Sequence, residues 1–189
     1  MLSEIGFTAL IPINEVAPQE LYRLEQFSCG TPSLDMFLHA QALNLHSDHL
    51  SHTSVFFHED FAGLVGYITL SNDSIPLKAS EVGELGLAYQ TDLQSFPAVK
   101  IGRLAVHCDL QCQGLGARLL NLAIGEVIGA QTVSASRLII TDAVNDARVI
   151  GFYEQQGFLE SFWAADQARN RGKGKDRATI KMIRDIYAA

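Results

Sequence analysis

The sequence predicts an α/β fold: a single domain in which helices flank a mixed β-sheet. Apolar runs of strand length alternate with amphipathic helical stretches along the 189 residues. A chain of this length that is 48% hydrophobic can bury one full core, and no internal repeat indicates a second one. Two closely spaced glycines, Gly114 and Gly116, mark a sharp turn from a strand into a long helix. We therefore expect one domain over residues 1–189.

The first part of the chain predicts a strand followed by two helices. The apolar run at 5–13 indicates the strand, and the segment 18–27, which begins with proline, indicates a short helix. A second helix is expected to begin at a cap on Thr31 or Ser33 and to continue to about His46. Residues at helical intervals along it predict a face that packs on the sheet. These residues are Leu34, Phe37, Leu38, Gln41, Ala42 and Leu45.

The remaining segments alternate between strand and helix patterns. Segments 53–58 and 64–70 indicate a hairpin. Residues 71–97 are rich in Asp, Ser, Gly and Pro and indicate an irregular excursion with room for a short helix. The later elements are a strand at 98–107, a helix at 115–131, a strand at 137–141, a helix at 146–156, and strands near 158–163 and 178–183. Neighbouring parallel strands bring their carboxyl ends to one edge of the sheet, where ligands bind.

The segment 111–116 reads Gln-Cys-Gln-Gly-Leu-Gly and is named here the glycine turn. Without Cβ atoms, Gly114 and Gly116 let the backbone turn tightly and present successive N–H groups to an anion. The next helix begins there, so its unpaired first-turn amides and the positive end of its dipole point to the same place. A pyrophosphate would fit this turn. The alternative is a tight strand-to-helix turn that binds nothing.

A second motif lies about forty residues further along the chain. Residues 152–158 read Phe-Tyr-Glu-Gln-Gln-Gly-Phe and close a short helix, with Gly157 as the expected left-handed residue after it. With the glycine turn and the run Ile-Gly-Arg-Leu-Ala-Val at 101–106, this motif resembles the GNAT superfamily of acyl-CoA-dependent N-acetyltransferases. The resemblance covers about residues 98–160. It implies a GNAT fold with a centrally splayed sheet, and acetyl-CoA as co-substrate without a metal.

The resemblance also implies roles for individual residues. The pantetheine arm would lie between the strands at 98–107 and 137–141, and a backbone N–H of the first would polarise the thioester carbonyl. Tyr153 would be the general acid that protonates the departing thiolate; otherwise it is an ordinary packing aromatic. The family's usual asparagine position is Asp146 here, which can instead cap the helix. The implied cofactor-binding residues are Leu104, Ala105, Val106, Gln111, Cys112, Gln113, Gly114, Leu115, Gly116, Ala117 and Asn145.

The spacing of residues along the sequence identifies neither the general base nor a metal site. Glu81, Glu84, His107 or a water could accept the proton of an amine, and alternation along the strand predicts that His107 faces outward. Three histidines have i, i+3, i+6 spacing, but their helix is expected to end among them and no carboxylate or thiol completes a site. They are interpreted as polar residues at a helix end: His46, His49 and His52.

Cysteine usage favours a reduced, cytoplasmic protein. Cys29, Cys108 and Cys112 are odd in number, and no pair has metal-ligand spacing, so no metal is predicted. Cys112 is expected to be a small filler residue. The first residues do not form a leader pattern, and no apolar run reaches membrane-spanning length. We therefore expect a soluble protein.

Positive charge is concentrated near the end of the chain. Seven of the 14 basic residues lie at or after position 169. Residues 1–168 contain the other seven, together with 19 of the 21 acidic residues. The basic residues are Arg169, Arg171, Lys173, Lys175, Arg177, Lys181 and Arg184. A solvated loop with a basic edge strand is one interpretation. The other is a contact for phosphate, on the cofactor or on a nucleic acid.

Two segments narrow the resemblance further. Residues 27–38 and 96–106 look like the GNAT branch of bacterial toxins that acetylate the α-amine of aminoacyl-tRNA, often beside a ribbon-helix-helix antitoxin. Lys100 and Arg103 would then help to hold tRNA phosphates, although the acidic body counts against RNA binding. The predicted reaction is direct acetyl transfer from acetyl-CoA to a primary amine. The alternatives are an acetyltransferase for a small amine, a peptide or a protein, and a non-catalytic acyl-CoA sensor. Because dimers are frequent in the family, a homodimer is a further expectation.

Overall fold

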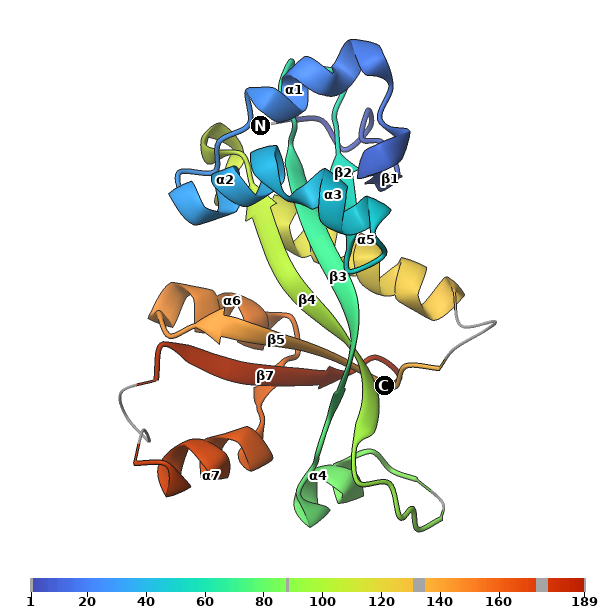
Figure 1. Cartoon of the computed structure of the whole chain (residues 1–189), viewed down its shortest axis with the longest axis vertical. Coiled ribbons are helices and arrows are strands. Elements are labelled where there is room, and N and C mark those ends of the chain that lie inside the picture. Colours follow the sequence, from blue (N-terminus) through green and yellow to red (C-terminus); the bar gives the residue numbers. More distant parts are fainter. Residues whose placement is uncertain (1, 88, 131–134, 173–176, 189) are drawn as a thin grey trace. The chain divides into compact units, whose positions relative to one another are not determined.

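The computed structural model describes residues 2–87, 89–130, 135–172 and 177–188. The chain forms two compact units. The first unit comprises Met1–Ser71 and Gly102–Glu126, and the second comprises Asn72–Ile101 and Val127–Ala189. Strands run in the order β1-β2-β3-β4-β5-β7-β6, with parallel and antiparallel neighbours (Figure 1). The predicted mixed α/β sheet is thereby confirmed.

The sheet of the first unit is built on the predicted hairpin. β2 (His52–Phe56) pairs antiparallel with β3 (Gly66–Ile75), and His52 lies opposite Leu70. The prediction of a strand over 5–13 is too long, because β1 contains only Ile11–Pro12 and a single bridge joins Phe7 to His58. Proline has no N–H for a ladder, and the 3₁₀ turn η1 (Ile13–Glu15) follows at once.

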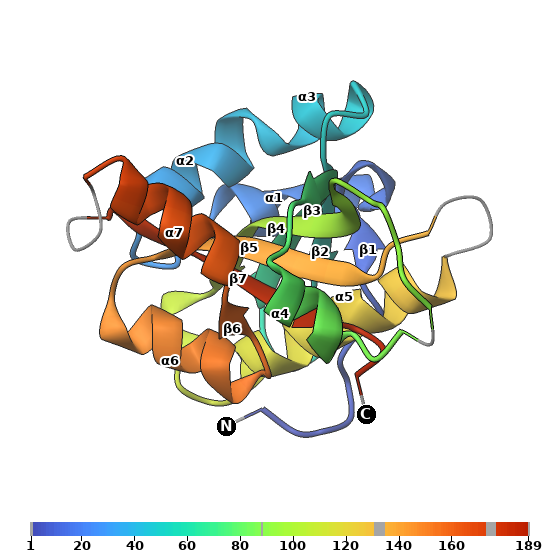
Figure 2. The ribbon, with the colours of Figure 1, turned by 90° about the horizontal axis from the view of Figure 1, so that it is seen from below.

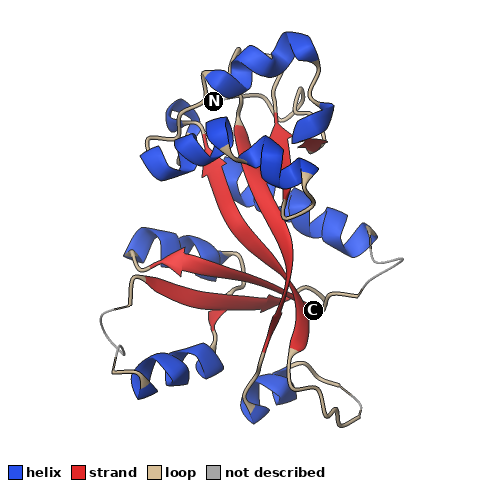
Figure 3. Cartoon of the chain, viewed as in Figure 1, coloured by secondary structure: helices blue, strands red, loops and turns tan. Residues whose placement is uncertain are grey.

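Helices cover both faces of this sheet, with α2 and α3 on one side and α5 on the other (Figures 2 and 3). η2 (Pro18–Glu20) and α1 (Leu21–Glu25) confirm the short helix at 18–27. The next predicted helix is divided into α2 (Pro32–Ala40) and α3 (Ala42–Ser47), because Gln41 leaves helical geometry at φ −126°. Buried side chains of α2 and α3 form a core with side chains of β2, β3 and the loop before α2. The residues of this core include Phe27, Phe37, Leu38, Ala42, Val55 and Tyr67.

The second unit contains the parallel pair of strands. Residues Ala98–Ile101 of β4 (Phe96–Val106) pair with Leu138–Thr141 of β5 (Leu138–Val144). β7 (Thr179–Asp185) runs antiparallel along β5 and also pairs with β6 (Leu159–Glu160). α6 (Ala147–Gln155) and α7 (Phe162–Asn170) lie on opposite sides of the β5–β7 pair in both views (Figures 1 and 2).

Two segments of the second unit differ from the prediction. The expected strand near 158–163 has only two residues, after which Ser161 accepts the N–H of Ala164 at 3.2 Å and begins α7. The excursion at 71–97 contains the end of β3, α4 (Ala79–Glu84) and the start of β4. Trp163 packs on the apolar cluster of this unit, which is Ile75, Leu85, Phe96, Ala98, Leu138 and Ile140.

The helix after the glycine turn is α5 (Leu115–Gly129), close to the predicted range. Its buried residues recur with helical spacing: Leu115, Leu119, Leu120, Ala123 and Ile124. Within the described ranges, no helix combines the length and the apolar character that crossing a membrane requires. The two parts of the predicted site therefore stand on regular elements: the glycine turn before α5 in the first unit, and Tyr153 on α6 in the second.

Candidate active site

The glycine turn has the backbone conformation that an anion site needs. Cys112 and Gly114 have φ of +60° and +79°, and they alternate with Gln113, whose φ is not positive. Such alternation turns successive N–H groups toward one side. A Cβ built on Gly114 would have no atom within 4 Å, and the first turn of α5 carries no acidic residue. The turn therefore fits a pyrophosphate: it offers donors, open space and the positive end of a 15-residue helix.

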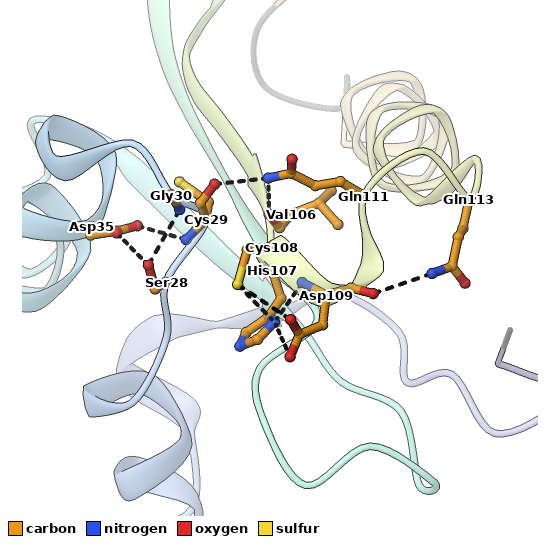
Figure 4. Close-up of polar contacts among 10 residues, drawn as sticks. All are labelled: Ser28, Cys29, Gly30, Asp35, Val106, His107, Cys108, Asp109, Gln111 and Gln113. Atoms are coloured by element: carbon orange, nitrogen blue, oxygen red, sulfur yellow. Dashed lines mark hydrogen bonds and ion pairs between the residues drawn. The ribbon is translucent and has the colours of Figure 1, made fainter.

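Two glutamines hold the glycine turn in place (Figure 4). The Gln111 amide donates to the carbonyl oxygens of Cys29 at 2.8 Å and Val106 at 3.1 Å. The Gln113 amide donates to the carbonyl oxygen of Asp109 at 3.3 Å, and its own buried Oε1 has no partner among the described residues. Both amide nitrogens are thus used for structure, which leaves the backbone N–H groups as the donors for a ligand.

The loop that receives Gln111 is fixed by a carboxylate. Asp35 on α2 accepts hydrogen bonds from Ser28 Oγ and Cys29 N, both at 2.8 Å (Figure 4). Burial alone would raise the pKa of Asp35, but the hydrogen bonds of Cys29 and Ser28 lower it below its ordinary value. The carboxylate therefore stays charged at neutral pH and anchors the loop. This support was not visible in the sequence, since Gln111 and Cys29 are 82 residues apart.

The end of β4 offers alternate backbone groups to its two edges. A Cβ on Gly66 of β3 would lie 2.5 Å from the Ala105 carbonyl oxygen, so Ala105 directs its backbone toward β3. His107 N likewise donates to Val65 O at 2.9 Å. Since successive residues of a strand point their N–H and C=O groups to opposite edges, Leu104 and Val106 present theirs to the other edge. Of the three predicted pantetheine contacts, these two have the required direction.

Tyr153 is held in a buried aromatic cluster of the second unit. Phe158 N donates to Tyr153 O at 3.0 Å and Gly157 N to Glu154 O at 2.9 Å, with Gly157 at φ +78°. This is a Schellman ending, as the motif predicts, and it packs the Phe158 ring 5.2 Å from the Tyr153 ring. Burial raises the pKa of the Tyr153 phenol, an effect that the hydrogen bond of Thr141 partly offsets. The phenol is therefore protonated at neutral pH, as a proton donor must be.

Asn145 and Asp146, the two residues before α6, have different contacts. Asp146 is the N-cap, and its side chain accepts the N–H of Arg148 at 2.9 Å. Asn145 donates from its side-chain amide to Arg177 O at 2.8 Å and from its backbone to Ala178 O at 3.0 Å. Its amide nitrogen is thus used within the second unit. The role of Asn145 as a cofactor contact stays a prediction.

Two of the candidate general bases have other contacts. Glu81 is 4% exposed, and its carboxylate accepts the N–H groups of Lys78, Phe162 and Trp163 at 2.7, 2.9 and 3.2 Å. The expectation that His107 faces outward is wrong, because its side chain is 15% exposed and packs against the rings of Phe27 and Phe61. Glu84 on the same helix as Glu81 is exposed.

The other histidine and cysteine predictions have mixed outcomes. α3 ends at Ser47, and His46 Nδ1 accepts the N–H of Thr53 at 3.1 Å, so His46 is a polar residue at a helix end as expected. For His52 the prediction is wrong, because this residue begins β2. Burial lowers the pKa of His52, with a further contribution from the nearby His46. Cys112 is not a filler residue, since it is exposed and has a left-handed backbone.

Of the basic residues near the chain end that the structure describes, Arg169, Arg177 and Lys181 are paired with carboxylates, and Lys173 and Lys175 lie outside the described residues. Asp142 binds both Lys100 and Lys181, with Nζ to carboxylate distances of 2.6 and 2.9 Å. Burial would raise the pKa of Asp142, but these two lysines lower it. Arg177 pairs with Glu160 and Arg169 with Asp166. Among the described residues, the basic side chains without a carboxylate partner are Arg103, Arg148, Arg171 and Arg184.

The comparisons with known proteins identify the family. Residues 19–158 match the acetyltransferase (GNAT) family, and the chain belongs to this family. It is 31% identical over 120 residues to a tRNA-acetylating toxin of Mycobacterium tuberculosis, an alignment that covers 64% of this chain and 69% of the relative.

Solved structures share the fold at lower identity. A bacterial toxin is 18% identical with a TM-score of 0.71 and covers 95% of this chain and 90% of its own. AtaTR bound with acetyl-CoA is 22% identical with a TM-score of 0.67, covering 93% and 92%. AtaT complexed with acetyl-methionyl-tRNAfMet is 22% identical with a TM-score of 0.64, covering 84% and 85%. The GNAT fold predicted from the two motifs is thereby confirmed.

Proposed function

We propose that this GNAT enzyme transfers an acetyl group directly from acetyl-CoA to the α-amine of an aminoacyl-tRNA. The observation that carries the acceptor is the 31% identity to a tRNA-acetylating toxin. The structure of AtaT with an acetylated methionyl-tRNA supports the same acceptor. The glycine turn and Tyr153 provide the chemistry that the reaction requires of the protein.

The glycine turn would bind the pyrophosphate of acetyl-CoA through the backbone N–H groups of residues 112–117, which include Leu115, Gly116 and Ala117. The backbone of Leu104 and the N–H of Val106, whose carbonyl accepts from Gln111, would bind the pantetheine arm at the edge of β4 that faces away from β3, and one of the two N–H groups would polarise the thioester carbonyl. The bound co-substrate supplies the acetyl group as a thioester. As the amine nitrogen forms the new amide bond and the C–S bond breaks, Tyr153 donates its proton to sulfur, and a base or water takes the amine proton.

The tRNA would contact basic side chains that lack carboxylate partners among the described residues. Arg148 and Arg171 are exposed in the second unit, whereas Lys100 and Lys181 share the carboxylate of Asp142. Phosphate contacts of this type position the nucleic acid without reading its sequence. In the cell, we propose a cytoplasmic protein that pairs with a ribbon-helix-helix antitoxin and forms a homodimer.

Incubation with acetyl-CoA labelled in its acetyl group tests both the proposed acceptor and the role of Tyr153 as the general acid. We expect label in aminoacyl-tRNA, with equal release of the free CoA thiol, and none in small amines or peptides. Tyr153→Phe should lower kcat by about 10²–10⁴-fold and leave the Kd for acetyl-CoA unchanged. Tyr67→Phe is the matched control, because Tyr67 is also buried but donates to Leu34 O in the first unit.

Each contrary result identifies a different alternative. Label found only in small amines or peptides would mean that the acceptor is wrong and that the enzyme class is right. Binding of acetyl-CoA without thiol release toward any acceptor would leave a non-catalytic acyl-CoA sensor. Equal loss of kcat in Tyr153→Phe and Tyr67→Phe would remove Tyr153 as the acid.

A further inference from the structure

Three consecutive residues after β4 gather donor atoms that none of the roles above uses. They are His107, Cys108 and Asp109, at the start of the 3₁₀ turn η3 (Cys108–Leu110). Cys108 Sγ lies 3.8 Å from His107 Nδ1 and 3.7 Å from Asp109 Oδ1, and His107 Nδ1 lies 3.8 Å from Asp109 Oδ2 (Figure 4). The two short distances to Asp109 involve different carboxylate oxygens, and one ligand atom from each of the three residues lies within 4.8 Å of the other two, which defines a triangle of a nitrogen, a sulfur and an oxygen.

This triangle matches one face of a zinc coordination sphere. Zinc binds sulfur at about 2.3 Å and nitrogen or oxygen at about 2.0–2.1 Å, so tetrahedral ligand atoms lie about 3.3–3.6 Å apart. The nitrogen–sulfur separation of 3.8 Å exceeds this by a few tenths of an ångström, and rotation of the exposed Asp109 side chain would bring a single carboxylate oxygen to the same distance from both. A thiolate and a carboxylate together would balance the charge of a divalent cation, and the mixed sulfur, nitrogen and oxygen set suits zinc better than magnesium or calcium.

The backbone of the three residues is already fixed. His107 N donates to Val65 O and Cys108 N to Ser28 O, both at 2.9 Å, so two other segments of the first unit hold the turn. The rings of Phe61 and Phe27 pack edge-on against the His107 ring at centroid distances of 5.0 and 5.9 Å. His107 Nδ1 accepts the N–H of Asp109 at 3.3 Å, so Nδ1 is the unprotonated ring nitrogen, and a bound ion would replace this long hydrogen bond.

Solvent reaches the open side of the triangle. Cys108 is exposed and the Asp109 side chain is 76% exposed, so an ion can enter and keep a water as its fourth ligand. We propose that His107, Cys108 and Asp109 form a binding site for one zinc-class divalent cation. The acetyl-transfer chemistry does not use this ion. The spacing of cysteine pairs does not indicate this site, because it contains one cysteine and its three ligands are consecutive in the chain.

Cysteine alkylation of the full-length, reduced protein tests the site without an activity assay. Cys108 and Cys112 are both exposed in the same loop, and only Cys108 belongs to the triangle. Saturating Zn²⁺ should slow alkylation of Cys108 by iodoacetamide about tenfold or more, because a metal-bound thiolate is a weaker nucleophile, and should leave Cys112 nearly unchanged. Peptide mass spectrometry measures both rates in one sample. Equal protection of the two cysteines, or protection of neither, would overturn the proposal.

Variants separate the triangle from other metal-binding residues. Asp109→Asn keeps the shape of an exposed side chain, and we expect it to raise the Zn²⁺ concentration for half-protection of Cys108 about 10–100-fold. His107→Gln should act in the same direction. His46→Gln is the control, because the His46 and His52 rings lie 4.7 Å apart and form the competing histidine pair. The proposal fails if Zn²⁺ protects Cys108 equally well in the wild type and in an Asp109→Asn variant that circular dichroism shows to be folded. It also fails if His46→Gln removes the protection.

Discussion

Gly114 has a φ of +79°, and a side chain there would extend into open space. In the proposed function that space holds the pyrophosphate. Gly172 is a matched residue outside the turn, with a φ of +71° and likewise no atom within 4 Å of a built Cβ. Alanine at either position must adopt a left-handed backbone, which costs about 1–2 kcal/mol. The two glycines thus differ in location and not in intrinsic strain.

We predict that Gly114→Ala raises the Kd for acetyl-CoA about tenfold, whereas Gly172→Ala leaves it unchanged. Displacement or distortion of one charge-assisted amide contact is worth about 1.5–3 kcal/mol, enough for that change. Isothermal titration calorimetry gives the Kd, and urea unfolding should show similar losses of stability in the two variants. An unchanged Kd in Gly114→Ala would show that the glycine turn does not bind the cofactor.

The residues that sequence analysis located correctly are those whose geometry is set locally. The left-handed Gly157 and the packing of Phe158 on Tyr153 follow from seven consecutive residues. Long-range contacts were not accessible in this way. Spacing cannot show that Gln111 donates to Cys29 O, or that His107 lies between two phenylalanines, because the partners come from other segments of the chain.

At the level of elements, α4 and α7 are joined by a single carboxylate. Glu81 lies on α4 and accepts two N–H groups from the first turn of α7, at Phe162 and Trp163. A negative charge at this end of α7 also interacts favourably with the helix dipole. The sequence 158–163 has strand character, and the helix instead begins at Ser161 because Ser161 and Glu81 accept its first amides. The prediction was wrong here since Glu81 is about eighty residues away.

We predict that Glu81→Gln lowers the free energy of unfolding by about 1–3 kcal/mol, because it replaces a charged acceptor of three backbone N–H groups. Glu84→Gln, an exposed change on the same helix, should alter stability by less than about 0.5 kcal/mol. Urea unfolding measures both. Below the unfolding transition, Glu81→Gln should retain kcat. A large loss of kcat with unchanged stability would instead assign Glu81 as the general base.

At the scale of the whole molecule, each unit has its own apolar cluster and its own buried tyrosine. Tyr67 is fully buried in the first unit, and burial raises the pKa of its phenol. Trp163, the single tryptophan of the chain, packs on the cluster of the second unit. Chain composition and length predicted one core. We propose that the two units nevertheless unfold as one domain over residues 1–189, because β3 and β4 pass through both.

The alkaline pH dependence of stability tests this cooperativity. A phenol whose pKa is raised on folding contributes stability that is complete below the unfolded pKa of about 10 and is lost as pH rises above it. Between about pH 8 and 10.5, Tyr67 alone should cost the wild type about 0.8 kcal/mol, and Tyr67→Phe should remove this loss. In one cooperative unit, urea unfolding monitored by Trp163 fluorescence shows the difference, although Tyr67 lies in the other unit. If Tyr67→Phe changes the pH dependence of circular dichroism and not that of the Trp163 signal, the units unfold separately and the single-domain proposal is wrong.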